Sequence, residues 1–359
     1  MTPAFPTRWH SRVLLAGLVL SLALPLLLDW IGPPARAEVY RTIPKNIGPF
    51  AFISREIYEE TSEVDILFLG PSLLWVGIDA PLVQRELTRA LGRPARVLTF
   101  GMNFPGIDLQ YVLLRDFLER RKARMIVFSM PTARHISDSP HVFAYRFMRY
   151  GEDVQALEGL SVRNRAALYA GEVLGAPRQF LSLLRPNLVA REATLSDTRG
   201  AYLVRQGYLG APFVRQQRTP PRLAPEQMIF SKRTPGSVAR FEFTDRELAP
   251  YQRHFLQRLG SLVEHHGVAS AIVHLPLAGE KGETTVKDVI YWPDVMGTDT
   301  PLIGIPSATL FQGMTDQEFY RNYYDDHLNS NGSEYFTQAI LPALIRIFQQ
   351  AIGSDVTEQ

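Results

Sequence analysis

The stretch Val64-Asp65-Ile66-Leu67-Phe68-Leu69-Gly70-Pro71-Ser72 decides the fold. Its apolar run has the length of a buried strand, and the Gly-Pro pair after it is typical of a strand end. In an open parallel α/β sheet, ligands bind at the edge where the strands end. The pattern Gly-x-Ser at this position therefore predicts that Ser72 exposes its hydroxyl at the site-forming edge.

Strand and helix patterns alternate after this stretch. Asp79 is the predicted N-cap of a helix over 81–91, and a strand over 96–100, a helix over 107–121 and a strand over 125–130 follow. This alternation predicts right-handed βαβ units, and therefore an α/β fold with a mainly parallel sheet.

The same alternation returns in the last third of the chain. It predicts a helix over 246–266, a strand over 269–275, a short strand over 308–311 and a closing helix over 334–352. We divide the chain accordingly into an N-terminal targeting segment (1–37), a connector (38–62), the first part of the domain (63–140), a largely helical insertion (141–245) and the second part of the domain (246–353).

The composition excludes several classes of site. The chain has 359 residues, no cysteine and a formal net charge of +2. A chain without cysteine has no thiol nucleophile, no cysteine metal site and no disulfide. A nearly neutral chain does not have nucleic acid as its expected partner. We find no phosphate-loop motif and no convincing metal-ligand spacing, so we expect neither a cofactor nor a metal.

The N-terminus has the pattern of a targeting segment. Arg8, His10 and Arg12 precede an apolar run over 13–28. This run is either a short membrane anchor or the apolar part of a signal peptide, for which Ala35-Arg36-Ala37 is the cleavage motif. We favour the anchor because of the length of the run. Both interpretations place the rest of the chain outside the cytoplasm, at the membrane or in the periplasm.

The insertion over 141–245 breaks the α/β pattern. It is rich in Arg, Pro and Gly, and between Gly151 and Arg240 its basic side chains outnumber the acidic ones. Two interpretations remain open. The arginines either solvate helices and pack their stems, or they contact anionic glycan or lipid head groups.

Ser72 is the candidate nucleophile, and a serine hydroxyl needs a neighbouring base to be activated. The segment Tyr324-Asp325-Asp326-His327-Leu328-Asn329 supplies a candidate base, His327, because histidine is the usual proton shuttle near neutral pH. Asp325 is the preferred carboxylate for orienting the imidazole, since its i−2 spacing lets the side chain return to the ring. Asp326 is the alternative.

Structural roles are open for each of these residues. A serine after a strand often caps a turn, and a loop histidine with Asn329 or Ser330 often precedes a capped helix. The loop Phe100-Gly101-Met102-Asn103-Phe104-Pro105-Gly106 follows the second predicted strand. Gly101 offers a backbone N–H and Asn103 a side-chain amide to an oxyanion, or the two form a glycine turn with a capping Asn.

Other polar and aromatic residues are weaker candidates. His135, Asp138 and His141 follow the third predicted strand, at the edge that holds Ser72, without metal-ligand spacing. His265-His266 ends a helix, where basic side chains are favourable. Tyr291-Trp292 either lines a sugar or acyl subsite or packs in the core.

Three segments together resemble the SGNH/GDSL hydrolase superfamily. Asp65-Ile-Leu-Phe-Leu-Gly-Pro-Ser72 resembles its first sequence block, Phe100-Gly101-Met102-Asn103 with Gly106 its oxyanion region, and Asp325-Asp326-His327-Leu328-Asn329-Ser330-Asn331-Gly332 its last block. The chain is most similar to the membrane-anchored extracytoplasmic branch, which includes alginate O-acetylation proteins and the D-alanylation protein of teichoic acid synthesis. It departs from the superfamily in Gly-Pro-Ser, where Gly-Asp-Ser is usual, and in the absent third block.

The resemblance implies a flavodoxin-like three-layer sandwich and a serine acyl-enzyme mechanism without a cofactor. It implies O-acetyl transfer to a cell-surface or exported polysaccharide, with Ser72, His327 and Asp325 as the catalytic residues and Gly101 and Asn103 at the oxyanion. It also implies a membrane-bound O-acyltransferase as partner. The alternatives are a plain extracytoplasmic esterase or lipase, and a catalytically silent scaffold or glycan-binding subunit of an envelope complex.

Overall fold

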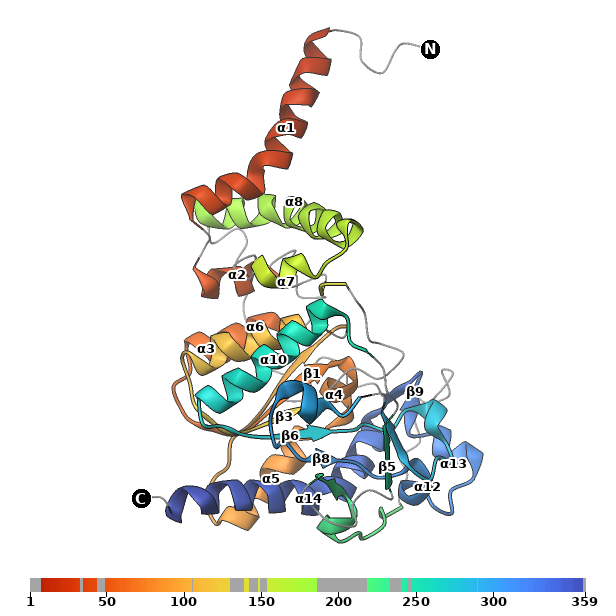
Figure 1. The fold of residues 1–359 in the computed structure, drawn as a ribbon. Helices are drawn as coiled ribbons and strands as arrows, with labels where there is room; N and C mark the ends of the chain where they lie inside the picture. The colour runs from red at the N-terminus through yellow and green to blue at the C-terminus, as the bar shows by residue number, and fades with distance from the viewer. Residues whose placement is uncertain are drawn as a thin grey trace.

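A computed structural model describes residues 8–32, 35–43, 49–104, 106–129, 139–141, 148, 154–185, 218–232, 240–243, 247–288 and 290–357. Its centre is an α/β sandwich around a mostly parallel sheet, which confirms the predicted fold class (Figure 1). In the described part of the chain this sheet has six strands in the order β2-β1-β3-β6-β8-β4. The five parallel strands follow the flavodoxin-like order, and β4 pairs with β8 as an antiparallel edge strand.

The strands are short and buried. They are β1 (Val64–Pro71), β2 (Val97–Met102), β3 (Ala123–Phe128), β4 (Ile229–Phe230), β6 (Ala269–Val273) and β8 (Leu302–Ile303). Every residue of β1 is buried, as expected for a central strand covered by helices on both faces. The side chains of β1 alternate between the two hydrophobic cores, with Leu67 and Leu69 on one side and Ile66 and Phe68 on the other.

Helices cover both faces of the sheet. In Figure 1, α3 (Phe50–Tyr58), α6 (Ile107–Leu118) and α10 (Pro250–His265) lie above it, and α5 (Ala80–Leu91) and α14 (Ser330–Thr357) lie below. The helix α5 is capped as predicted. The Asp79 carboxylate accepts a hydrogen bond from the Leu82 N–H at 3.0 Å, and Gly92 ends the helix with φ +65°.

A second group of helices stands on the α6–α10 layer. It consists of α1 (Arg8–Ile31), α2 (Arg36–Thr42), α7 (Val154–Glu158) and α8 (Val162–Leu184) (Figure 1). The predicted connector over 38–62 contains most of α2 and all of α3, and Tyr40, Phe50 and Ile53 belong to the main hydrophobic core.

The remaining elements are short and lie near the carboxyl ends of the strands or along the β8 side of the sheet. They are α4 (Ser72–Gly77), η5 (Pro225–Gln227), β5 (Phe241–Phe243), η7 (Ala278–Glu280), β7 (Val286–Asp288), α11 (Trp292–Met296), α12 (Ser307–Leu310), α13 (Asp316–Tyr320), β9 (Tyr323–Tyr324) and β10 (His327–Leu328). Strands β5 and β7 form a parallel pair, and β9 and β10 form a hairpin.

The last predicted strand was wrong. The segment 308–311 falls within and just after the helix α12, and the fifth parallel strand is β8, directly after Pro301. Short apolar runs do not distinguish a strand from a helix turn by periodicity. The sixth strand, β4, comes from the segment that the sequence assigned to the insertion, so part of this segment completes the sheet.

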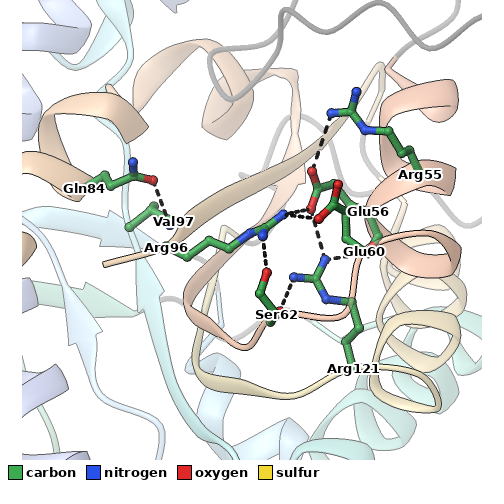
Figure 2. Close-up of polar contacts among 8 residues, drawn as sticks. All are labelled: Arg55, Glu56, Glu60, Ser62, Gln84, Arg96, Val97 and Arg121. Carbon is green, nitrogen blue, oxygen red and sulfur yellow. Dashed lines mark hydrogen bonds and ion pairs between the residues drawn. The ribbon is translucent and has the colours of Figure 1, made fainter. Parts of the chain in front are cut away.

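An ion cluster closes the amino edge of the sheet, opposite to the end of β1 (Figure 2). Glu56 on α3 is 3% exposed and accepts hydrogen bonds from Arg96 at 2.7 Å and from Arg121 at 3.0 Å. Arg121 also donates to the backbone carbonyl of Ser62, just before β1. The cluster therefore ties α3 to the starts of three neighbouring strands, because Arg96 precedes β2 and Arg121 precedes β3.

Candidate active site

Ser72 lies at the point where the strand order of the sheet reverses. The strand β1 has β2 on one side and β3 on the other, and Ser72 follows its last residue as the first residue of α4. In open α/β sheets this reversal point opens the crevice in which ligands bind. Ser72 is half-buried, which suits a residue at the edge of a crevice.

His327 completes a pair with Ser72 although 255 residues separate them in sequence. The hairpin of β9 and β10 packs against α4 and places the His327 Nε2 atom 2.9 Å from the Ser72 Oγ atom. This distance is within the hydrogen-bond range expected of a serine and its general base. The structure thus brings together the two residues that the sequence predicted as nucleophile and base.

Three buried asparagines hold the hairpin that carries His327. The Asn329 amide donates to the backbone carbonyls of Arg321 and Tyr323, and its oxygen accepts from the N–H groups of Asn331 and Gly332. The Asn331 amide donates to the Asn322 side chain at 2.9 Å. Asn329 therefore caps α14, as the sequence suggested, and also fixes the hairpin to this helix.

Gly332 is required for this close packing. A Cβ atom at Gly332 would lie 2.2 Å from the backbone oxygen of Asn322, which is too close for any other residue. The glycine and asparagines of the segment Asn329-Ser330-Asn331-Gly332 thus position the hairpin that carries His327.

The two candidate carboxylates lie at the tip of the hairpin. Asp325 is exposed and has φ +54°, a conformation that Asp tolerates better than most residues, and Asp326 is half-buried beside it. Among the described residues, neither carboxylate forms a hydrogen bond or ion pair with the His327 ring. The orienting role of Asp325, with Asp326 as the alternative, stays a prediction.

We expect Asp325→Asn to lower kcat by less than about tenfold, because an exposed carboxylate is screened by water, whereas a buried one that orients the base contributes about 10⁴-fold. Asn also tolerates positive φ, so the hairpin is retained. Ester turnover by Asp325→Asn and Asp326→Asn, measured side by side, checks this. A loss of about 10³-fold in one variant would show that its carboxylate turns toward the ring during catalysis.

The predicted oxyanion residues lie on the strand beside β1. Gly70 pairs with Gly101 and Pro71 with Met102, so Ser72 is level with Asn103. Gly101 is packed under Trp75, whose Cγ atom lies 2.1 Å from where a Cβ would be. The glycine therefore lets α4 approach β2, and its oxyanion role and that of Asn103 remain predictions.

A buried network supports the loop after β2. The Nε2 atom of the His141 ring forms a hydrogen bond of 2.8 Å with the backbone carbonyl of Asn103. The backbone N–H of His141 donates to the Asp108 carboxylate at 2.7 Å. The Tyr251 hydroxyl donates to the same carboxylate at 3.0 Å. Burial lowers the pKa of His141, against the attraction of Asp108, so the ring is held neutral. The network presents Phe104, which has φ +65° and is 61% exposed.

A small pocket with a volume of about 20 Å³, partly open to solvent, lies at the same edge and has room for about one water molecule. Its wall includes Leu73, Ser129 and His274, which follow β1, β3 and β6. Most of the other lining side chains are apolar and come from β5, β6, β7, β8 and the segment after β6: Phe241, Phe243, Ile272, Val273, Leu275, Val286 and Leu302, with Asp288 among them. The pocket thus begins at Leu73, next to the candidate nucleophile Ser72, and most of its lining side chains are apolar.

His274 and Glu280 form an ion pair on this wall, with the His274 Nε2 atom 3.0 Å from the Glu280 carboxylate. Burial opposes protonation of His274, but the nearby carboxylate outweighs it and raises the pKa of the imidazole. Sequence reasoning missed this pair because Pro276 and an irregular loop separate the two residues. The position of His274 directly after a predicted strand was the available signal.

The structure places the weaker candidate residues in different environments. His135 and Asp138 lie outside the described residues, and His141 belongs to the network under Asn103. His265 ends α10, as predicted. Trp292 is fully buried and donates to Asp288, so it packs in the core and does not line a sugar subsite. Among the described residues no group of three His, Asp or Glu side chains has an arrangement suited to a metal ion.

Comparison with known proteins gives no assignment of this site. No protein-family model matches the chain, and no curated protein matches it significantly. The geometry of the residues themselves therefore carries the functional argument.

Proposed function

We propose that the protein is a serine acyl-transfer enzyme that works outside the cytoplasm, with O-acetyl transfer to a surface or exported polysaccharide as its reaction. The observation that carries the proposal is the 2.9 Å contact between Ser72 Oγ and His327 Nε2 at the reversal point of the sheet. The resemblance of the surrounding segments to SGNH-type enzymes supports the same reaction.

In the proposed reaction, Ser72 Oγ attacks the carbonyl carbon of an acyl donor while His327 Nε2 takes the hydroxyl proton. The tetrahedral intermediate collapses to an acyl-serine, and the protonated imidazole gives its proton to the leaving group. A sugar hydroxyl then attacks the acyl-serine with His327 again as base. The Gly101 N–H and Asn103 amide are the proposed donors to the oxyanion, and Asp325 is the proposed orienting group.

The pocket beside Leu73 supports a place for the acyl group. Its walls are mainly apolar, and its volume of about 20 Å³ leaves room for little more than the methyl of an acetyl group.

Two exposed aromatic rings support a saccharide as acceptor. Outside α1 and α8, the large apolar side chains that are exposed among the described residues are Phe104, at 61%, and Tyr324, at 40%. Phe104 follows Asn103, which is level with Ser72, and Tyr324 is the cross-strand partner of His327. The rings thus flank the catalytic pair, and an aromatic face packs well against the C–H groups of a pyranose ring.

We expect Phe104→Ala to lower kcat/KM for transfer to a glycan about tenfold more than kcat/KM for hydrolysis of a small ester, because one aromatic stack contributes about 1–1.5 kcal/mol. Phe104→Tyr is the matched control and should restore transfer. The assay follows acetyl transfer from a chromogenic ester to an oligosaccharide by mass spectrometry. Ester hydrolysis without transfer would favour a plain esterase, and the absence of both would favour a silent scaffold.

The helix α1 supports anchoring in a membrane. Residues Arg8–Leu28 are long and apolar enough to cross a bilayer, and Trp9 and Trp30, at its two ends, are 69% and 85% exposed. Trp residues favour the two membrane–water interfaces. Cleavage after Ala37 would also remove Arg36, whose guanidinium pairs at 2.8 Å with the buried Asp116. This pairing favours an uncleaved anchor that holds the domain on the periplasmic side.

A further inference from the structure

The helix α8 carries an apolar stripe on its exposed side. The stripe repeats at intervals of three and four residues and consists of Ala167, Ala170, Leu174, Pro177, Leu181 and Leu184. Its three leucines are 63%, 50% and 62% exposed. This spacing places all six side chains along one face of a helix, over a length of about 26 Å.

The opposite side of α8 is the one that packs on the protein. Leu168, Gly171, Gly175 and Gln179 are buried, and they follow the same spacing about half a turn away from the stripe. The exposed side of the helix is therefore at least as apolar as its buried side. In water, such a stripe on a single helix would be left uncovered.

The exposed charges lie at the two ends of the stripe. Arg178, between Leu174 and Leu181, is half-buried and turns toward the protein, where it donates to the backbone carbonyl of Thr42 in α2. Every exposed side chain that the structure describes from Ala166 to Leu184 is apolar or, in Tyr169, aromatic. Arg163 and Arg165 precede this segment, and Arg185 follows it; all three are exposed. Basic residues flanking an apolar helix face are typical of helices that lie in the head-group region of a membrane.

The stripe lies beside the predicted anchor. The Tyr169 hydroxyl donates to the Leu22 carbonyl of α1 at 2.6 Å, and the lower part of α1 packs against α8 (Figure 1). The apolar surface of α1 is itself exposed along most of its length. The contact at Leu22 places α8 within one to two turns of the end of the span at Leu28, which is the depth of a head-group boundary.

We propose that α8 is an interfacial helix that lies in the outer leaflet of the membrane spanned by α1, with its apolar stripe among the acyl chains and its arginines among the lipid phosphates. The bilayer is the occupant because it covers α1 and the stripe as one continuous apolar surface. A second copy of the chain would leave the exposed face of α1 in need of a separate cover. The proposal rests on α1 as an anchor and is independent of the acyl-transfer chemistry.

The absence of native cysteine makes the proposal directly testable in the full chain. Leu174→Cys and Leu181→Cys, each labelled with an environment-sensitive fluorophore, are reconstituted in vesicles of phosphatidylethanolamine and phosphatidylglycerol. Glu264→Cys, exposed near the end of α10 and remote from α8, is the matched control. All three substitutions are at exposed positions, and thermal unfolding of each labelled protein checks that it is folded.

We expect blue-shifted emission at positions 174 and 181, quenching by lipids that carry a spin label near the head group, and protection from aqueous iodide. The label at position 264 should show the reverse. Water-like emission at 174 and 181 would overturn the proposal. Protection from iodide without quenching by lipid would also overturn it, because it would show that a protein partner covers the stripe. These readouts need no catalytic activity, so they remain informative if the proposed reaction is wrong.

Discussion

Replacement of Ser72 by alanine is expected to abolish the acyl-enzyme and to lower kcat for ester turnover by at least about 10³-fold. The residual rate would come from binding and oxyanion stabilisation alone. His327→Ala is expected to give a similar loss, because the serine hydroxyl is then left without a base within hydrogen-bond distance. The two losses should not add in the double variant, since the residues act as one unit.

A serine-directed fluorophosphonate followed by mass spectrometry of the labelled peptide checks this prediction. Ser129→Ala is a matched control, because Ser129 follows β3 at the same edge of the sheet and donates its backbone N–H to the Leu69 carbonyl. Labelling at Ser72 that requires His327 and tolerates Ser129→Ala would support the proposed enzyme. A folded wild-type protein that is not labelled would contradict it and favour a scaffold.

The second large effect is expected at the opposite edge of the sheet. Glu56→Ala should destabilise the folded protein by about 3–5 kcal/mol, because it leaves Arg121 buried without its carboxylate partner. Arg121 is only 4% exposed, so water does not readily replace the lost interaction (Figure 2). Without Glu56, Arg96 also loses the shorter of its two contacts with carboxylates.

Glu60→Ala is the control for the ion cluster. Glu60 also contacts Arg96, but at 3.5 Å and with its side chain 40% exposed, so its loss should cost less than about 1 kcal/mol. Urea unfolding of the full chain in nanodiscs, followed by tryptophan fluorescence, measures both variants. Equal effects of the two substitutions would show that the cluster is solvated and contributes little.

The parts of the fold that could be predicted from the sequence are those set by patterns of a few neighbouring residues, such as helix caps and apolar strands. Asp79 and Pro81 predict the start of α5, and the apolar run before Gly70 predicts β1. The pair of Ser72 and His327 could also be predicted, because Gly70 lies just before Ser72 and Asn329 and Gly332 lie just after His327. Such local patterns suffice because capping and strand burial act over a few residues.

Other parts depend on contacts between distant segments. The strand β4 has only two residues, and it becomes a strand because β8 offers a free edge. The network of Asp108, His141 and Tyr251 joins three segments, so no local pattern predicts it. The distance between the Asp325 carboxylate and His327 likewise depends on the turn of the hairpin, which sequence spacing alone does not determine.

The asparagine network at the start of α14 makes the proposed reactivity of Ser72 depend on the packing of this helix. The position of His327 depends on the docking of this last helix. The reactivity of Ser72, near the start of the domain, therefore requires that the end of the chain has folded. Labelling of Ser72 would thus report that the whole domain has folded. A chain whose last helix has not yet docked would not be labelled, and it would gain reactivity only when this helix packs against the hairpin.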